Sequence, residues 1–221
     1  MKKFLNFIQN SKVKSGIILF LLFTLYIFIC ASNYVQAVSS NISNSVFRLH
    51  VIANSDNKED QNLKYKVRDA LLNYMNELCK DITSKEDAIL MVQNNKDNFE
   101  NIAIKVIHDE GFDYSVNINI GNFQFPTKTY GDISLPAGMY DALRVEIGAA
   151  VGKNWWCVLF PSLCFIDISS GVVEEDSKTM LEDNLSEESY TIVSDNSNGI
   201  VKFKFKILEF FGMGNITTAK N

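Results

Sequence analysis

Residue types that serve acyl-transfer chemistry stand close together at residues 50–56. His50 could act as a base, Ser55 as a nucleophile and Asp56 as an orienting acid, so an exported hydrolase acting on cell wall or peptide is one hypothesis. A triad needs side chains that converge in space, however, and His50 lies in a strand pattern several residues before the turn. Asp56 is better explained as a helix N-cap and Ser55 as a turn residue.

A second nucleophile would be Cys157 paired with His50. Cys157 stands between Trp156 and Val158 in a continuous apolar run, where a buried thiol is inert rather than reactive. The chain has two histidines, His50 and His108, far apart in sequence, and no Cys-x-x-Cys pair. We therefore expect no metal site, and because phosphate-binding and dinucleotide-binding motifs are absent, we expect no cofactor.

The elements that would position these residues begin with a strand and a helix. Residues 47–53 alternate between apolar and other side chains, which predicts a strand with one buried face. A polar turn follows at residues 54–56, and Asp56 precedes Glu59 by three positions, the spacing of a capping box. Apolar residues then continue at helical spacing to residue 78. Arg68 lies inside a second apolar stripe of this helix, so it is either paired within the fold or open to a partner.

The remaining pattern predicts two helices and then strands. A helical region begins at Thr83, with Glu86 at capping-box spacing, and residues 94–98 divide it in two. From residue 112 the period changes to two, and Gly121 and Asn122 predict a hairpin turn. Pro126 places the return strand at an edge or at a bulge. Further strands are expected at 139–147, 155–160 and 201–207, and an acidic surface helix within 171–189. The fold class is α+β, one domain with an amino-terminal strand, two or three helices and a mainly antiparallel sheet.

The N-terminus has the layout of an export signal. Four lysines and no acid precede or flank an apolar stretch at residues 16–31, and Val35-Gln36-Ala37 offers a small-residue cleavage site. The stretch is shorter than the roughly 20 residues of a typical span, so a cleaved signal and an uncleaved anchor both stay open. The expected divisions are a signal or anchor at 1–37, a linker at 38–45, the domain at 46–211 and a flexible tail at 212–221.

Charge excludes one class of partner. The chain carries 21 basic and 26 acidic residues, a net charge of −5, and the four N-terminal lysines leave 17 basic residues for the rest. Binding nucleic acid requires a basic face that neutralises phosphates, so nucleic acid is not an expected partner.

Two blocks of sequence resemble a known family. RLHVIANSD and EDQNLKYKVRDALL form the first block, and LPAGMYDALRVEIG with NWWCVLFPSLCF forms the second. Together they are similar to the stage II sporulation protein R family over about residues 47–167. The resemblance implies a protein made in the forespore and exported into the space between the two membranes. There it would activate a membrane-embedded aspartic protease of the mother cell, which processes the sigma-E precursor.

On this resemblance the chain is not an enzyme and takes no small-molecule substrate; it works by binding one state of its receptor. A membrane-tethered structural module is a third hypothesis, favoured if the N-terminus is not cleaved. The recognition site is expected where aromatic and arginine anchors lie near strand ends and turns. Its predicted members are Arg48, His50, Asn54, Ser55, Asp56, Asp60, Arg68, Tyr140, Arg144, Trp155 and Trp156. The segments 48–60 and 136–144 and Arg68 are expected to converge on one face, with Arg48, His50, Asp56, Asp60 and Arg68 as a charged cluster beside Tyr140 and Arg144.

Cysteine spacing suggests one disulfide. Cys157 and Cys164 are separated by a Pro-Ser turn in a chain that leaves the cytoplasm, so they could be bridged. The flanking tryptophans and the turn could equally aim the two thiols apart.

Overall fold

The computed structural model describes residues 11–78, 82–162, 173 and 175–194. Its centre is a four-stranded sheet in the order β2-β5-β1-β6, where β1 and β5 are parallel and the other pairs antiparallel. A separate two-stranded hairpin, β3 and β4, follows β2 in the chain. The strands are β1 (Phe47–Ile52), β2 (Val116–Phe125), β3 (Lys128–Tyr130), β4 (Ile133–Leu135), β5 (Gly138–Ile147) and β6 (Asn154–Phe160).

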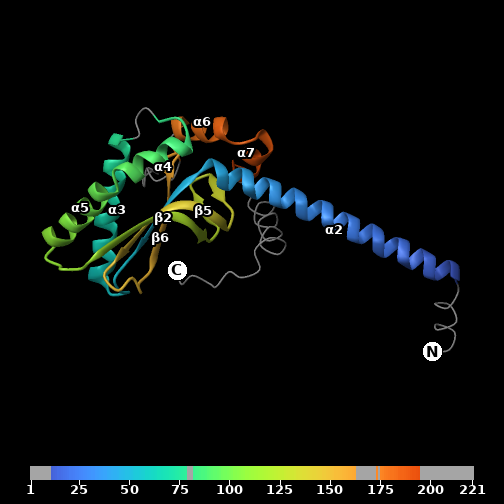
Figure 1. The fold of residues 1–221 in the computed structure, drawn as a ribbon, viewed down its shortest axis with the longest axis horizontal. Coiled ribbons are helices and arrows are strands. Elements are labelled where there is room, and N and C mark those ends of the chain that lie inside the picture. The colour runs from blue at the N-terminus through green and yellow to red at the C-terminus, as the bar shows by residue number, and fades with distance from the viewer. Residues whose placement is uncertain (1–10, 79–81, 163–172, 174, 195–221) are drawn as a thin grey trace.

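Helices cover both faces of this sheet (Figure 1). On one face, which we call the helix face, α3 (Lys58–Leu78), α4 (Lys85–Asn94) and α5 (Lys96–Asp109) bury one apolar cluster. On the opposite face, which we call the tether face, a second cluster forms under the end of α2 (Ser11–Ser45), the β3–β4 hairpin, α6 (Glu175–Asn184) and α7 (Glu187–Ser194). The predicted α+β class with a mainly antiparallel sheet is confirmed.

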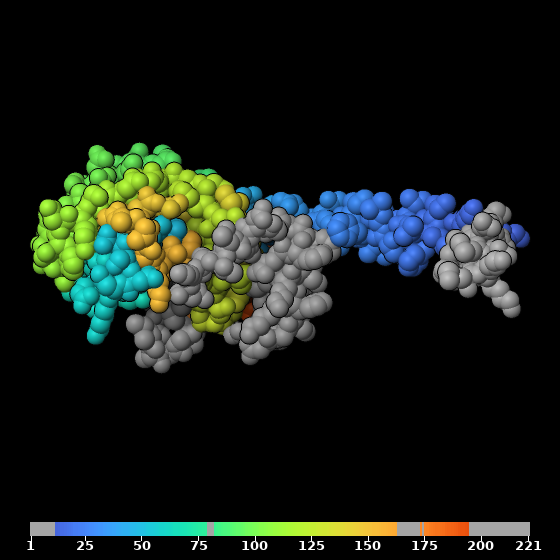
Figure 2. All heavy atoms as spheres, turned by 90° about the horizontal axis from the view of Figure 1, so that it is seen from below, coloured from blue at the N-terminus to red at the C-terminus, as the bar shows by residue number. Residues whose placement is uncertain are grey.

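Helix α2 projects from the body as a long rod (Figures 1 and 2). Among the described residues it is the helix that is long and apolar enough to cross a membrane. Its large side chains are exposed from Ile17 to Ile29, whereas Val35, Val38 and Ile42 are buried in the tether-face cluster. Residues 38–45, predicted to be a linker, are instead the last turns of this helix, because their apolar positions recur at helical spacing and pack on the sheet.

Strand β1 is buried on both faces, so the prediction of one buried face is wrong. Phe47, Leu49 and Val51 pack on the helix face as their alternation predicts. Arg48 and His50 point the other way, and they too are buried, beneath aromatic residues that come from later strands. A central strand between two covered faces loses the polar-outward pattern of a half-exposed one.

Two predicted helix starts are displaced by one residue. Asn57, not Asp56, caps α3, because its Oδ1 accepts the backbone N–H of Asp60 at 2.8 Å. Ser84, not Thr83, caps α4 through the backbone N–H of Asp87. The predicted break within 94–98 is confirmed, since α4 ends at Asn94 and α5 begins at Lys96.

The predicted hairpin turn at Gly121 and Asn122 is wrong, because β2 runs through both residues as one ten-residue strand. Its apolar residues change face there: Ile118 packs on the helix face, whereas Phe125 packs on the tether face. In sequence this change of phase resembles two short strands. The edge position suggested by Pro126 is confirmed, since β2 ends the order of the sheet. The predicted strand at 201–207 and the tail at 212–221 lie outside the described residues.

Candidate functional site

Arg48 occupies the middle of the tether face and is fully buried. Its guanidinium carbon lies 4.1 Å from the centre of the Phe125 ring and 4.7 Å from that of Tyr140. Its Nη2 donates to the Tyr130 hydroxyl at 2.7 Å, and its Nε lies 3.4 Å from the Cys157 carbonyl. Nη1 is buried without a hydrogen-bond partner. Aromatic faces and neutral oxygens thus hold this cation, which makes it a member of the interior rather than a surface anchor.

His50 lies two residues further along β1 on the same face. Its ring stacks on Trp156 with centres 3.8 Å apart, and its Nε2 lies 2.7 Å from Oδ1 of Asn154. Because an amide oxygen only accepts, Nε2 carries the proton and Nδ1 is an acceptor, buried without a partner. Burial lowers the pKa of His50 to about 4. The charges of Arg144 and Arg48 lower it further, whereas the hydrogen bond with Asn154 acts in the opposite direction. His50 is therefore neutral at neutral pH.

Arg144 stands beside His50 in the parallel register of β5 with β1. Its Nη2 lies 2.7 Å from Oε1 of Glu146, whose other oxygen accepts from Asn117 at 2.9 Å. The guanidinium carbon lies 5.4 Å from the centre of the Phe123 ring, and Nε has no hydrogen-bond partner. About a third of the side chain is exposed, so its planar donor group is held in place while part of it faces solvent.

Asn54 ties the end of β1 to the loop between β5 and β6. Its Oδ1 accepts the backbone N–H of Ala149 at 2.9 Å, and its Nδ2 donates to Asp60 at 2.8 Å. Gly148 and Gly152 approach this turn so closely that a Cβ on either would overlap it, at 2.3 Å from Asn54 and 2.2 Å from a backbone oxygen. The loop is therefore fixed against the β1–α3 turn.

A cavity of about 310 Å³ opens where this loop meets the ends of β1 and β5. Three of the predicted site residues line it: His50, Asp56 and Arg144. Arg144 and Lys153 set two cations against the single carboxylate of Asp56. The other lining residues are Ile52, Ala150, Val151, Gly152 and Asn154.

Ser55 and Asp60 are engaged with each other, since the Ser55 hydroxyl donates to Asp60 at 2.6 Å. Burial alone would raise the pKa of Asp60, but hydrogen bonds from Ser55 and Asn54 hold it below its usual value. Asp56 is exposed, and the hydrogen-bond partner of His50 is an amide. The described geometry does not assemble His50, Ser55 and Asp56 as a triad.

Arg68 lies across the sheet from the cavity. It pairs with Asp69 at 2.6 Å, and its guanidinium carbon lies 4.3 Å from the centre of the Trp155 ring. Trp155 packs with the helix-face cluster, whereas Trp156 belongs to the tether face. The predicted convergence on one face is therefore wrong as a whole. The tether face gathers Arg48, His50, Tyr140, Arg144 and Trp156, the β1–α3 turn holds Asn54, Ser55, Asp56 and Asp60, and the helix face holds Arg68 and Trp155.

Sequence reasoning missed Asn154, Lys153 and Lys64. Lys64 is almost fully buried, and its Nζ donates to Gln61 at 2.7 Å and to the Lys153 carbonyl at 3.1 Å. Burial, with the charge of Arg68 nearby, lowers the pKa of Lys64 to about 8. The sequence signal for a buried Lys64 was its position between Leu63 and Tyr65, two apolar positions of the helix. Asn154 carried none beyond its place before two tryptophans.

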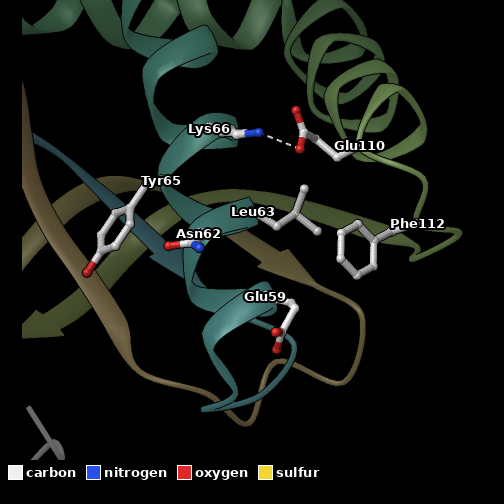
Figure 3. Close-up of a pocket in the computed structure, with 7 residues that line it drawn as sticks. All are labelled: Glu59, Asn62, Leu63, Tyr65, Lys66, Glu110 and Phe112. Carbon is white, nitrogen blue, oxygen red and sulfur yellow. Dashed lines mark hydrogen bonds and ion pairs between the residues drawn. The ribbon is translucent and has the colours of Figure 1, made fainter.

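A second hollow, of about 430 Å³, lies between the first turns of α3 and the turn after α5 (Figure 3). Lys66 and Glu110 form an ion pair across it, with Leu63 and Phe112 below. It contains none of the predicted site residues, and its acids and lysine are mixed in sign. We do not assign a function to it.

Comparison with known proteins identifies the family. A family model described as stage II sporulation protein R matches residues 43–170. This chain belongs to the stage II sporulation protein R family. It is 40% identical over 139 residues to the stage II sporulation protein R of Bacillus subtilis (strain 168), an alignment that spans 62% of this chain and 62% of that protein. No solved structure matches this chain.

Family membership implies a role in sporulation, and the apolar helix α2 is consistent with a signal or membrane anchor. The matched range covers the whole four-stranded sheet and helices α3 to α5. It therefore includes both the Arg48 interior and the cavity of Arg144. Cys157 is disulfide-bonded, whereas Cys30 is free and exposed. The predicted partner, Cys164, lies outside the described residues.

Proposed function

We propose that this protein is an exported sporulation signal that acts by binding and not by catalysis. It crosses the forespore membrane and, from the space between the two membranes, activates a membrane-embedded aspartic protease of the mother cell, which processes the sigma-E precursor. Family membership supports the sporulation role. The receptor, the processing step and the compartment are the substance of the proposal.

One observation favours binding at the tether face: Arg144 is held in place but not fully used. Glu146 and Phe123 fix its guanidinium beside a 310 Å³ cavity, its Nε is buried without a hydrogen-bond partner, and about a third of the side chain stays exposed. An arginine whose geometry is set in advance loses little side-chain entropy on binding, which is typical of residues that dominate an interface. His50 lines the same wall with a neutral ring.

Burial divides the predicted partner-binding residues into two groups. Arg48 and Tyr140 are fully buried, so they shape the tether face from beneath. Arg144, Asp56 and Lys153 line the cavity and are the residues through which a receptor would be contacted. Arg68 and Trp155, also predicted as anchors, lie on the helix face. Substitutions there would show whether a receptor contacts both faces of the sheet.

The test is co-expression of the full chain with the candidate protease and its sigma-factor precursor, scored by precursor processing. Arg144→Ala is expected to reduce processing strongly while the melting temperature stays nearly unchanged, and Arg144→Lys to restore only part of it, because a lysine lacks the planar fork. Arg68→Ala serves as the matched control on the helix face and is expected to process normally. If the wild-type chain does not stimulate processing, the proposed function is wrong. If Arg144→Ala folds and activates fully, the function can stand but this site assignment is wrong.

A further inference from the structure

Strand β2 is a long sheet edge without the features that normally protect such edges. Among the residues that the structure describes, it pairs on one side only, with β5. Its ten residues, VNINIGNFQF, contain no charge and no proline. Natural edge strands are usually short, charged, bulged or covered, because unpaired N–H and C=O groups are a template for another strand. The side chains of Asn117, Asn119, Asn122 and Gln124 are exposed, so both faces of the strand reach solvent.

The side chains of β2 restrict what can pair with it. Before Gly121 the apolar residues, Val116, Ile118 and Ile120, pack with the helix-face cluster. After Gly121 they are Phe123 and Phe125, which pack with the tether-face cluster. Amide side chains occupy the complementary face in each half. A strand added beside β2 must therefore present apolar residues on the helix face opposite residues 116–120, and on the tether face opposite residues 123–125.

A second copy of this chain does not satisfy that requirement. In antiparallel pairs, directly opposite residues share a face. In the register that pairs almost the whole of β2, a two-fold axis normal to the sheet would therefore place each half of the strand against the other half. Ile118 would then oppose an amide such as Gln124. Asn119 would oppose an aromatic ring such as Phe123. A two-fold axis along the strands would turn the second copy over and again set apolar residues beside amides.

We propose that β2 is a docking edge for an extended segment of a different protein, which adds antiparallel to it as a fifth strand. The segment would carry apolar residues at i, i+2, i+5, i+7 and i+9, the pattern of β2 read in reverse. The chain's own segment at residues 201–212 meets four of these positions, at Phe203, Phe205, Leu208 and Phe210, but it has Gly212 at the fifth and Ile207 out of phase. Backbone hydrogen bonds supply the affinity of such a pairing, and the shifted pattern supplies its specificity. Only the identity of the partner, the protease receptor, rests on the proposed function.

The edge also has apolar surface ready to be covered. Helix α5 packs on β2, and Ile102 and Val106 of this helix are only partly buried, as are Val116 and Ile120 of the strand. On the tether face Phe123 is partly buried beneath the guanidinium of Arg144. An added strand would complete the burial of these side chains on both faces, each in the half of β2 where its own apolar residues would lie.

The probe is a fluorescent ten-residue peptide with valine at its first, third, sixth, eighth and tenth positions and threonine elsewhere. Its matched control has the same composition in strict alternation. Binding is measured by anisotropy to the full chain in lipid nanodiscs. We expect the shifted peptide to bind at least tenfold more tightly. We also expect N-methylation of alternate peptide amides to abolish binding in one register and spare it in the other, because every second N–H of an added strand faces β2.

Asn119→Lys places a charge on the edge and is expected to weaken peptide binding at least tenfold, whereas Asn101→Lys, the same change at an exposed position of α5, is expected to leave it unchanged. Equal binding of the two peptides, or binding that Asn119→Lys does not affect, would overturn the inference. So would a dimer of the full chain that Asn119→Lys dissociates, since that would place a second copy on the edge.

The processing assay separates this inference from the proposed function. If the shifted peptide binds as expected but the wild-type chain does not stimulate processing, the docking edge stands and the identity of its partner is wrong. If the wild-type chain stimulates processing, and a folded Asn119→Lys variant does so equally without binding the peptide, the proposed function stands and the receptor does not use β2.

Discussion

The end of α2 should behave as part of the domain, and Ile42→Ala tests this directly. Ile42 is fully buried in the tether-face cluster, so its truncation removes core contacts and leaves a cavity. Such Ile-to-Ala changes cost about 2–5 kcal/mol. For a domain of this size each kcal/mol lowers the melting temperature by about 2–4 °C, so we expect a decrease of roughly 4–20 °C.

The matched control is Ile29→Ala, the same chemical change in the same helix. Ile29 is 49% exposed in the apolar rod and makes no contribution to the domain core. Urea unfolding of the full chain in nanodiscs, followed by tryptophan fluorescence, measures both variants, since the two tryptophans lie in β6. Equal free energies of unfolding for the two variants would refute the assignment of residues 38–45 to the core and support a linker.

Three further predictions concern groups on and around the tether face. The unfolded chain binds a proton at His50 below a pH of about 6.5, whereas the folded chain does so only below about 4. The free energy of unfolding should therefore decrease by up to about 3 kcal/mol as the pH falls from about 6.5 to about 4, and His50→Gln should remove this part of its pH dependence. Gly152→Ala should destabilise the loop, because the new Cβ would lie 2.2 Å from a backbone oxygen, whereas Gly121→Ala meets only ordinary contacts at 3.6 Å and should not, as thermal unfolding of the two variants would show. Non-reducing peptide mapping should find Cys157 in a disulfide, and a link to Cys164 would confirm the pairing expected from spacing, whereas a link to another cysteine would refute it.

The local pattern of the sequence was sufficient for most elements but not for their environment. The helix-face residues of β1 follow from alternation alone. The burial of Arg48 does not, because the rings that surround it, Phe125, Tyr130 and Tyr140, come from strands about 80 or more residues later. Contacts at such separation leave no periodic signal in the segment itself. The same is true of Asn154, which meets His50 across the β1–β6 pair.

The misplaced turn at Gly121 has a different cause. A change of apolar phase at a glycine predicts two strands when each face is assumed to meet a single core. Here both faces of the sheet are covered, so one continuous strand can bury its first half on the helix face and its second half on the tether face. The convergence of Arg68 with Arg144 failed for the same reason, since a two-sided sheet separates residues that a one-sided sheet would bring together.

The rigid entry of α2 into the domain predicts that the helical phase of the tether matters for activation. Ser45 donates to the carbonyl of Asn184 at 2.5 Å, and Tyr34 donates to Glu188 at 2.7 Å, so the root of α2 is fixed to the body. At 1.5 Å per residue, only about 6 Å separates Ala31, where the apolar stretch ends, from the first buried contact at Val35.

An inserted alanine after Ala31 rotates the body by about 100° relative to the membrane segment, whereas seven inserted alanines make nearly two full turns and restore the orientation. If the proposed receptor is embedded in the facing membrane and the uncleaved chain presents its tether face to it, one alanine should reduce precursor processing and seven should largely restore it. Both insertions leave the packing of Val35 and the residues after it intact, so the free energy of unfolding should match the wild type. Equal processing by both variants and the wild type would mean that the tether does not orient the domain, as would be the case for a chain released by cleavage.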